Sequence, residues 1–315
     1  MSCCKEIGGY FSLECANAPM YHNNAVLLNS ARNALRYIIR AYNIKKIALP
    51  YYTCPVVWQV VKDENCAIIP YDINDSFLPD ISLDKDIYIV YNNYFGICDK
   101  NVELLSKQYS NLIIDNAQAF YSRKKGLASF YSPRKFFGLP DGGIVSSDKK
   151  LDKYLERDTS YELCSHLLMR HDLEASVGYN EFQKNDIALI GRPLKLMSNL
   201  TQNLMKNIDY EQTKDKRLKN FVFLHNTLKE SNKIKIDLSL DYIPMVYPYK
   251  TDNYDLRSKL IKNKIYVAKY WPVDEGSGCM RSKKSQELAD GIIPLPIDQR
   301  YNSDDMRIIL EVLSV

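Results

Sequence analysis

One lysine stands in a segment whose composition suits covalent chemistry. Residues 128–146 read ASFYSPRKFFGLPDGGIVS, so that Lys135 lies between a serine-rich approach and a pair of glycines. An amine in such a loop can hold an aldehyde cofactor as a Schiff base. Most lysines are solvated surface charges, so the interpretation of Lys135 depends on the residues that accompany it.

A carboxylate and a helix start could serve the same chemistry. The run LIIDNAQAF at 112–120 is apolar up to Asp115, which places this carboxylate at the carboxyl end of a buried strand, where ligands bind in open α/β sheets. An Asp that caps a turn is the alternative. At 27–35, LLNSARNAL opens an amphipathic helix with small polar residues, and the free N–H groups of a helix start can bind phosphate. Ordinary capping is the alternative there.

Together these three features match the needs of pyridoxal 5'-phosphate (PLP). This cofactor requires an amine for its aldehyde, a carboxylate for its pyridine nitrogen and N–H groups for its phosphate. Asp115 lacks the further acidic neighbours that Mg²⁺ prefers, and no two of the four histidines are at metal-ligand spacing. The sequence therefore predicts a PLP site and no metal site.

The order of apolar segments predicts an α/β protein. A helical pattern covers 27–41, and short strand-like runs follow at 46–50, 67–71, 87–91, 112–115 and 143–146. This alternation favours a mostly parallel sheet that is covered on both faces. Further helices are expected at 151–165, 195–227 and 303–313, and further strands at 243–247, 265–270 and 292–295.

Length and composition indicate a cytoplasmic protein of two domains. At 315 residues the chain exceeds the usual size of a single core, so we expect a large domain over 1–195, a helical connection over 196–230 and a small α+β domain over 231–315. A formal charge of +4 with scattered basic clusters argues against a nucleic-acid partner. There is no apolar run of membrane-spanning length, and eight cysteines without a CxxC pair indicate reduced thiols.

The motifs resemble those of the DegT/DnrJ/StrS family of PLP-dependent, mostly nucleotide-sugar, aminotransferases. IIDNAQAFYS resembles the family's Asp-x-Ala-Gln/His-Ala segment, and SPRKFFGLPDGG resembles its lysine segment. Shorter similarities occur in GGYFSLE, LNSARNAL, ALPYYTCP, NNYFG, RPLKLMSNL, YWP and LPIDQRY, so the resemblance spans nearly the whole chain. It implies the aspartate-aminotransferase-like fold type I of PLP-dependent transferases, with a large mostly parallel-sheet domain, a small C-terminal α+β domain and a homodimer.

The resemblance also assigns roles to individual residues. Lys135 matches the Schiff-base lysine, Asp115 the partner of the pyridinium nitrogen, and Gln118 the residue that contacts the cofactor's phenolic oxygen. The implied phosphate ligands are Ser30, Ala31, Arg32 and either Ser132 or Ser129.

Two further assignments are less direct. Asn180, in VGYNEF, matches an Asn that the dimer partner donates to the phosphate, with an exposed loop Asn as the alternative. Tyr52 comes from the segment that supplies an aromatic ring to stack on the cofactor. Tyr51 and Cys54 are alternatives for that place, and ordinary core packing is the alternative for the aromatic rings.

The activity implied is amino-group transfer. The expected donor is an amino acid, glutamate first, and the expected acceptor is a keto group of a nucleotide-linked deoxysugar in surface-polysaccharide biosynthesis. Two alternatives stay open: a small non-sugar keto or aldehyde acceptor, and a protein that keeps the fold for binding or regulation without turnover. The lysine loop reads PDGG in place of the more frequent GEGG, the helix start lacks the usual Gly-Thr pair, and Asp115 is only 20 residues before Lys135. These departures indicate a divergent, short member.

Overall fold

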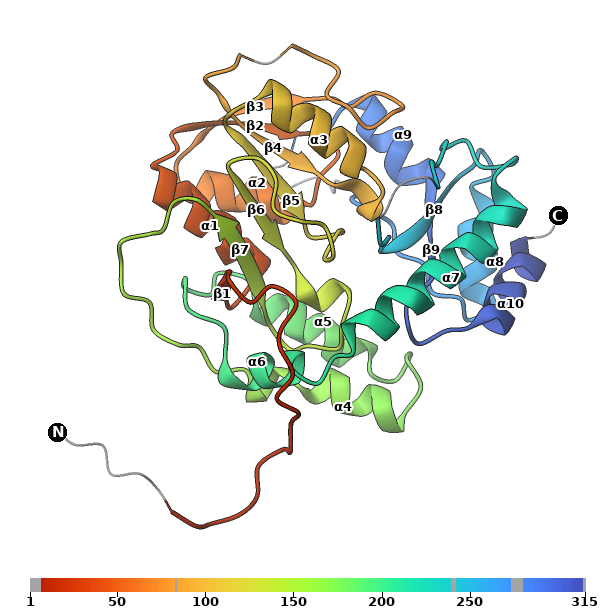
Figure 1. Ribbon diagram of the computed structural model, residues 1–315. Helices are drawn as coiled ribbons and strands as arrows, with labels where there is room; N and C mark the ends of the chain where they lie inside the picture. The colour runs from red at the N-terminus through yellow and green to blue at the C-terminus, as the bar shows by residue number, and fades with distance from the viewer. Residues whose placement is uncertain (1–6, 83, 239–241, 273–279, 314–315) are drawn as a thin grey trace.

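The chain folds around a central sheet of seven strands (Figure 1). The computed structural model describes residues 7–82, 84–238, 242–272 and 280–313. Strands follow the order β1-β7-β6-β5-β4-β2-β3 across the sheet. The five parallel strands are β2 (Lys46–Pro50), β3 (Ala67–Tyr71), β4 (Tyr88–Asn92), β5 (Leu112–Asn116) and β6 (Ala128–Tyr131). At the other edge, β7 (Gly143–Ser147) and β1 (Val26–Leu28) pair antiparallel. The α/β class and the mostly parallel sheet are confirmed.

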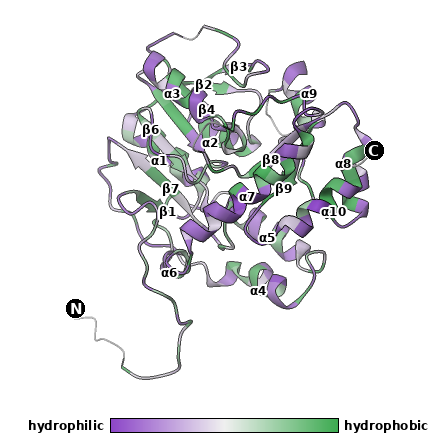
Figure 2. Ribbon diagram, turned by 45° about the vertical axis from the view of Figure 1, so that its right-hand side comes forward, coloured by the Kyte–Doolittle hydropathy of each residue, from purple (hydrophilic) through white to green (hydrophobic). Residues whose placement is uncertain are grey.

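Successive residues of the strands serve two cores, one on each face of the sheet. On one face, Ile47 of β2 packs in a core with α1 (Ala31–Tyr42) and α2 (Pro55–Asp63). On the other face, Ala48 belongs to a larger core that includes residues of α3 (Asp99–Gln108). Because both faces are buried, the strands read as continuous apolar runs, and Figure 2 draws them largely in green.

A second, two-stranded sheet lies in the C-terminal part. Here β8 (Val246–Lys250) pairs antiparallel with β9 (Ile292–Pro296). Apolar residues of the two strands and of three helices form a third core around Phe221 and Tyr247. These helices are α7 (Tyr210–Leu228), α8 (Asp255–Lys262) and α10 (Ser303–Leu313). The small α+β unit therefore has a core of its own, while the division of the chain at 195 and 230 stays a prediction.

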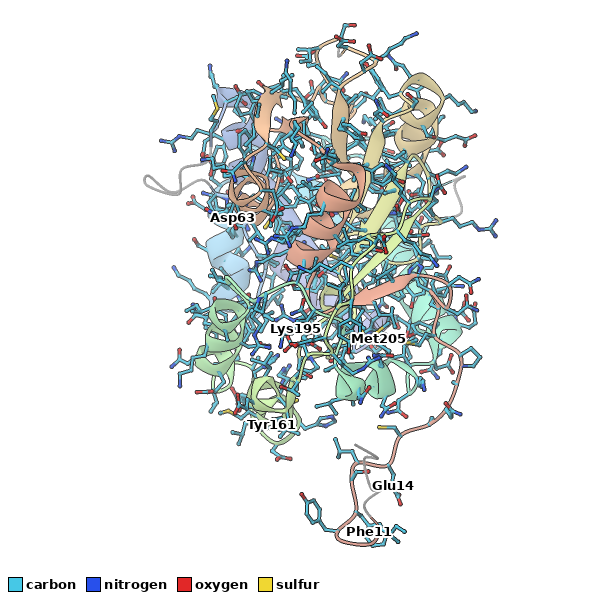
Figure 3. All side chains as sticks on the ribbon, turned by 90° about the vertical axis from the view of Figure 1, so that its left-hand side faces the viewer. Phe11, Glu14, Asp63, Tyr161, Lys195 and Met205 are labelled. Carbon is cyan, nitrogen blue, oxygen red and sulfur yellow. The ribbon has the colours of Figure 1, made fainter. Side chains whose placement is uncertain are left out.

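The remaining elements are short. Along the chain, between the two sheets lie α4 (Ser165–Asp172), α5 (Tyr179–Ala188) and α6 (Asn199–Met205), whereas α9 (Lys283–Gly291) directly precedes β9. The 3-10 turns are η1 (Tyr94–Gly96), η2 (Pro133–Lys135) and η3 (Tyr161–Leu163). The first described residues extend away from the body, and Figure 3 shows Phe11 and Glu14 far from both sheets, whereas Met20 and Tyr21, closer to β1, pack against the larger core. Of the helices in the described ranges, none is long and apolar enough to cross a bilayer.

Several local predictions are wrong for identifiable reasons. The helix expected from residue 27 begins at Ala31, because Val26–Leu28 pairs with β7 and the Ser30 hydroxyl accepts the N–H of Asn33 at 3.2 Å. The helix expected at 151–165 is replaced over most of its length by an extended segment whose backbone bonds to Leu196 at 2.8 and 2.9 Å. The helix expected at 195–227 is split into α6 and α7, and 265–270 is not a strand.

Candidate active site

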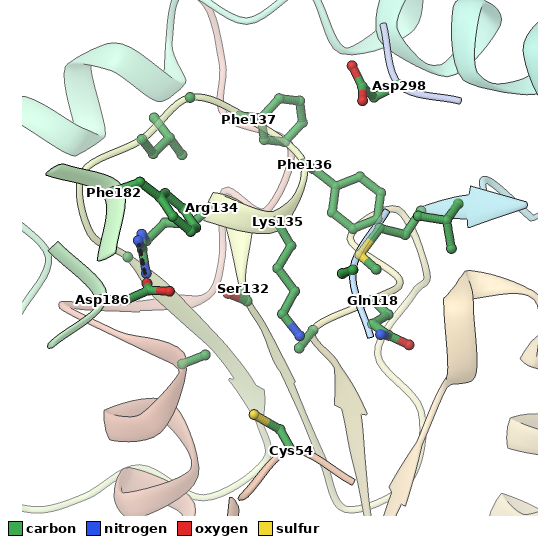
Figure 4. Close-up of a pocket in the computed structure, with 18 of the residues that line it drawn as sticks. Cys54, Gln118, Ser132, Arg134, Lys135, Phe136, Phe137, Phe182, Asp186 and Asp298 are labelled. Carbon is green, nitrogen blue, oxygen red and sulfur yellow. Dashed lines mark hydrogen bonds and ion pairs between the residues drawn. The ribbon is translucent and has the colours of Figure 1, made fainter. Parts of the chain in front are cut away.

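The chain encloses a pocket of about 1140 Å³ where the parallel strands end. Asp115 enters it from β5, Lys135 from η2 just after β6, and Ser30 from the start of α1. The parallel order brings these distant residues to one edge, since adjacent parallel strands end on the same side of a sheet. Figure 4 shows the side chain of Lys135 extended into the pocket, with its amine directed toward Gln118 and Cys54.

Lys135 and Asp115 form the electrostatic centre of the pocket. Lys135 keeps its side chain exposed, whereas Asp115 is only 7% exposed and accepts the N–H of Ala117 at 2.8 Å on Oδ1. Burial raises the pKa of Asp115, and the charge of Lys135 and the N–H of Ala117 oppose that rise. A buried carboxylate with so few partners is suited to pair with a cationic N–H group.

Gln118 is held by a strained turn. Its Oε1 accepts the N–H of Phe95 at 2.8 Å, and Phe95 has the positive φ of 57°. The next residue, Gly96, has φ of 74°, and a Cβ there would lie 2.6 Å from the Gln118 carbonyl oxygen, so glycine is required. Gln118 is 3% exposed and lines the pocket, yet its Nε2 has no hydrogen-bond partner among the described residues. A buried donor without a partner indicates that a ligand acceptor belongs opposite it.

The start of α1 forms one wall of the pocket. Ser30, Ala31 and Arg32 all line it, and no acidic residue offsets the positive end of the helix dipole in the first turn. Gly143 of β7 packs directly against the start of α1, since a Cβ at position 143 would lie 2.1 Å from the Ser30 carbonyl oxygen. Ser132 lines the same pocket. This wall has the chemistry of an anion site.

Two arginines add positive charge beside the helix start. Arg134 pairs with Asp186 of α5 at 3.0 Å, and both line the pocket together with Arg32 (Figure 4). Burial lowers the pKa of Arg32, and its Nε has no partner within the described part of the chain. Two guanidinium groups and one carboxylate leave a net charge of +1 (2 − 1) beside the helix start. Sequence reasoning missed this pair: Arg134 directly precedes Lys135 in the lysine segment, but its partner Asp186 lies 52 residues away and belongs to no motif.

The structure does not bring every predicted residue to the pocket. Ser129 is fully buried, and its hydroxyl bonds to the backbone of Lys125 at 3.0 and 3.2 Å, which leaves Ser132 as the serine of the lysine loop that faces the pocket. Asn180 is exposed on α5 and does not line the pocket of its own chain. Its role across a dimer stays a prediction.

Tyr52 also lies away from the pocket. It is 1% exposed, its ring stacks on Tyr94 at 5.7 Å, and it meets Trp271 edge-on at 4.9 Å. This is the core packing that was the alternative for this residue. Within the described ranges, Cys54 lines the pocket from the same segment and neither Tyr51 nor Tyr52 does.

Arg217 is a pocket residue that sequence reasoning missed. It is 1% exposed, and it donates to the carbonyls of Phe136 at 3.2 Å and Met245 at 3.0 Å and to the Gln299 side chain at 3.0 Å. Its guanidinium lies 4.5 Å from the centre of the Phe136 ring, and burial lowers its pKa to about 10. In the charged sequence of α7 nothing distinguishes this arginine from its solvated neighbours. It connects the lysine loop to β8.

Comparison with known proteins supports the fold. Neither a protein-family model nor a curated protein sequence matches the chain. Solved structures do match, among them S. venezuelae DesV in complex with a ketimine intermediate, at 15% identity and a TM-score of 0.64 over 92% of this chain and 83% of DesV. A DegT DnrJ EryC1 StrS aminotransferase from Brucella abortus matches at 14% identity and 0.62, over 92% and 84%.

A third structure, DesI in the presence of its TDP-sugar product, matches at 15% identity and a TM-score of 0.61, over 92% of this chain and 79% of DesI. Other matching structures are described as a PMP form or as holding bound PMP, the amino form of the cofactor. The chain thus shares its fold, the fold type I of PLP-dependent aminotransferases, with proteins of the DegT/DnrJ/EryC1/StrS group.

Proposed function

We propose that this chain, which has the fold of the DegT/DnrJ/EryC1/StrS aminotransferases, is itself a PLP-dependent aminotransferase. The observation that carries the proposal is the convergence of Lys135, Asp115 and Gln118 on one pocket beside a positively charged helix start. Fold alone does not define activity, so the argument depends on these side chains.

The residues present fit the cofactor. Gln118 and Arg32 each keep a buried donor without a partner among the described residues, and Gly143 lets the helix start approach closely. We assign the phosphate to the backbone N–H groups of Ala31 and Arg32, to Nε of the Arg32 side chain and to Ser132, and the phenolic oxygen to Nε2 of Gln118. The ring N–H would pair with Asp115, whose pKa is raised by burial.

The catalytic work falls to Lys135. PLP supplies an aldehyde carbon and a ring that withdraws electrons. The Lys135 amine would hold the cofactor's aldehyde at rest. Once an amino donor has taken its place, the freed amine would act as the base that accepts the proton of the donor's α-carbon and as the acid that returns it, and in the reverse direction it would serve the amination of the keto acceptor. Asp115 would hold the ring N–H and keep the ring nitrogen protonated.

For the acceptor, we propose a nucleotide-linked keto sugar, with glutamate as donor and surface-polysaccharide synthesis as the setting. DesI, one of the proteins with this fold, is recorded with a TDP-sugar product. The pocket is large, and its walls include the apolar ring faces of Phe136, Tyr270 and Trp271, against which a sugar ring can pack. A small keto compound as acceptor is an outcome that a substrate screen distinguishes.

We further propose a homodimer. The α4–α5 face exposes an unusual number of large apolar side chains next to the pocket, and such patches mark interaction surfaces. They are Leu168, Leu173, Val177, Tyr179, Phe182, Ile187 and Ile190. Asn180 is exposed on the same face, which is consistent with its predicted role toward the partner subunit.

We place the protein in the cytoplasm. The described cysteines at 15, 54, 66, 98 and 164 are all free thiols, a usage that suits a reducing compartment.

Spectroscopy tests the cofactor and the activity together. The purified protein incubated with PLP should show a visible absorption band, which glutamate should bleach. Borohydride should fix the cofactor on the peptide that contains Lys135. Lys135→Ala should abolish the visible band and the borohydride fixation. The matched control Lys125→Ala, at an exposed lysine that does not line the pocket, should abolish neither. A protein that gains no band with PLP refutes the proposal, and a band that no amino donor bleaches refutes the aminotransferase activity.

A further inference from the structure

Cys54 lies on the pocket wall among the residues that we assign to the cofactor. It directly precedes α2, its side chain makes no capping hydrogen bond, and it is half-buried and lines the pocket. Burial raises the pKa of its thiol, while the charges of Lys135, Asp115 and Arg32 each perturb it. The sulfur is therefore close to the groups proposed for the aldehyde, the ring nitrogen and the phosphate. In Figure 4 its sulfur points into the same space as the Lys135 amine.

The aromatic residues of the same segment are committed elsewhere. Tyr52 packs on Tyr94 and Trp271, and its carbonyl accepts the hydroxyl of Tyr94 at 2.9 Å. Tyr51 stacks on Trp58 of α2 at 6.2 Å. Neither ring lines the pocket in the part of the chain that the structure describes, so this segment offers a sulfur atom where an aromatic ring was expected.

A second observation indicates a ligand at this place. Gln118 is 3% exposed, lines the pocket, and keeps Nε2 without a partner among the described residues. Cys54, Gln118 and Lys135 line the same pocket (Figure 4), so a polar ligand that satisfies this amide and approaches Lys135 occupies the space that Cys54 also borders.

We propose that the Cys54 sulfur is the surface against which the flat ring of the bound cofactor lies, in the place of a stacking aromatic residue. The inference rests on the proposed function, because it requires that PLP occupies this pocket. Sulfur is soft and polarizable and makes favourable contacts with aromatic rings, so it can support the ring without covering it. A ring held in this way also covers the thiol. The rate at which a thiol reagent reaches Cys54 should therefore fall when the cofactor binds.

The first experiment measures this access. Methyl methanethiosulfonate is a small reagent that transfers its SCH₃ group to a thiolate and releases methanesulfinate. Peptide mass spectrometry should find the group on Cys54 in cofactor-free protein. With PLP at about ten times its Kd, roughly one site in eleven is free, so labelling of Cys54 should slow about tenfold. Cys15 lies ahead of the folded body and outside the pocket, and its labelling rate should not change.

The second experiment reverses the order. Protein first labelled at Cys54 should give no visible band with PLP, and dithiothreitol, which removes the SCH₃ group as a mixed disulfide, should restore the band. Cys54→Ala loses the sulfur contact and should bind PLP more weakly, but at a PLP concentration that saturates this variant the reagent should not prevent its band. This control tests whether labelling of the other cysteines, and not of Cys54, causes the loss of the band.

The outcomes separate the two proposals. If PLP gives a band while Cys54 reacts equally fast with and without it, the inference about Cys54 is overturned and the cofactor assignment stands. If unlabelled wild-type protein gives no band, the cofactor assignment is overturned and the inference about Cys54 with it. Labelling of the wild-type chain decides the matter even if Cys54→Ala fails to fold.

Discussion

Replacing Gly143 by alanine should damage the proposed phosphate site from behind. The added Cβ would lie 2.1 Å from the Ser30 carbonyl oxygen and 2.6 Å from the Ala31 nitrogen, whereas ordinary contact begins at 3.4 Å. The helix start must therefore retreat by about 1.3 Å (3.4 − 2.1) relative to β7. Overpacking of this kind typically lowers the free energy of unfolding by about 1–3 kcal/mol.

The same retreat should weaken cofactor binding. If the helix start loses one hydrogen bond to the charged phosphate, worth about 1.5–3 kcal/mol, the Kd for PLP rises roughly tenfold to hundredfold. Urea denaturation without cofactor gives the first quantity, and titration of the visible band gives the second.

A matched glycine provides the control. Gly138 lies in the loop between Lys135 and β7, and a Cβ there would make only an ordinary contact of 3.6 Å with the Leu167 side chain. Gly138→Ala should change the unfolding free energy by no more than about 0.5 kcal/mol. If Gly143→Ala binds PLP as tightly and unfolds at the same urea concentration as Gly138→Ala, then the close packing of β7 on the helix start is not what shapes the site.

Three further predictions follow from buried charges. Since burial raises the pKa of Asp115, the folded cofactor-free protein holds this proton more tightly than the unfolded chain, and its stability falls as pH rises through that pKa. Added PLP should thus raise Tm more above the pKa of Asp115 than below it, and Asp115→Asn should remove this dependence of the Tm increase on pH. If the variant keeps the pH profile of the wild-type protein, the proposed pairing of Asp115 with the ring nitrogen is contradicted. Arg32→Gln should weaken PLP about tenfold but not pyridoxal, which lacks the phosphate, in titrations of the visible band; equal losses for both would exclude a phosphate role. Arg217→Met leaves the Met245 carbonyl without its donor, while the Phe136 carbonyl keeps the side-chain amide of Gln299 at 2.8 Å. The free energy of unfolding in urea should therefore fall by about 1–3 kcal/mol, and a neutral effect would show that water replaces the guanidinium.

The strands of the fold and the reactive centre were predictable because they depend on short local patterns. The strands predicted at 46–50 and 67–71 are β2 and β3, and the final helix is α10, with the predicted bounds. Asp115 and Lys135 follow strands whose apolar runs end abruptly, and parallel pairing then dictates that their side chains meet. Two short strands, β1 and β6, escaped detection because three or four residues adjoining a helix or a turn carry no period of their own.

The rest of the pocket depends on details that a single sequence does not specify. Whether Tyr52 or Cys54 faces the pocket depends on how the chain turns between Pro50 and Pro55. The two residues are only two positions apart, yet Tyr52 packs in the core and Cys54 lies on the pocket wall. The placement of Arg217 depends on the docking of α7 against the lysine loop, and such long-range contacts leave no periodic trace. The extended segment that replaced the helix at 151–165 is likewise fixed by a distant partner, Leu196.

The hydrogen bonds of Arg217 have a consequence for how the protein opens. One buried guanidinium joins the Phe136 carbonyl to the Met245 carbonyl beside β8, so the lysine loop breaks these hydrogen bonds if it loosens while the small sheet stays folded. Regions joined in this way open as one cooperative unit, so the amide protons of the loop around Lys135 should exchange with solvent at the rate of β8 and β9. The position of the Lys135 amine would then depend on a sheet near the C-terminal end of the sequence. Selection for a stable C-terminal unit would also maintain the geometry that the reaction needs.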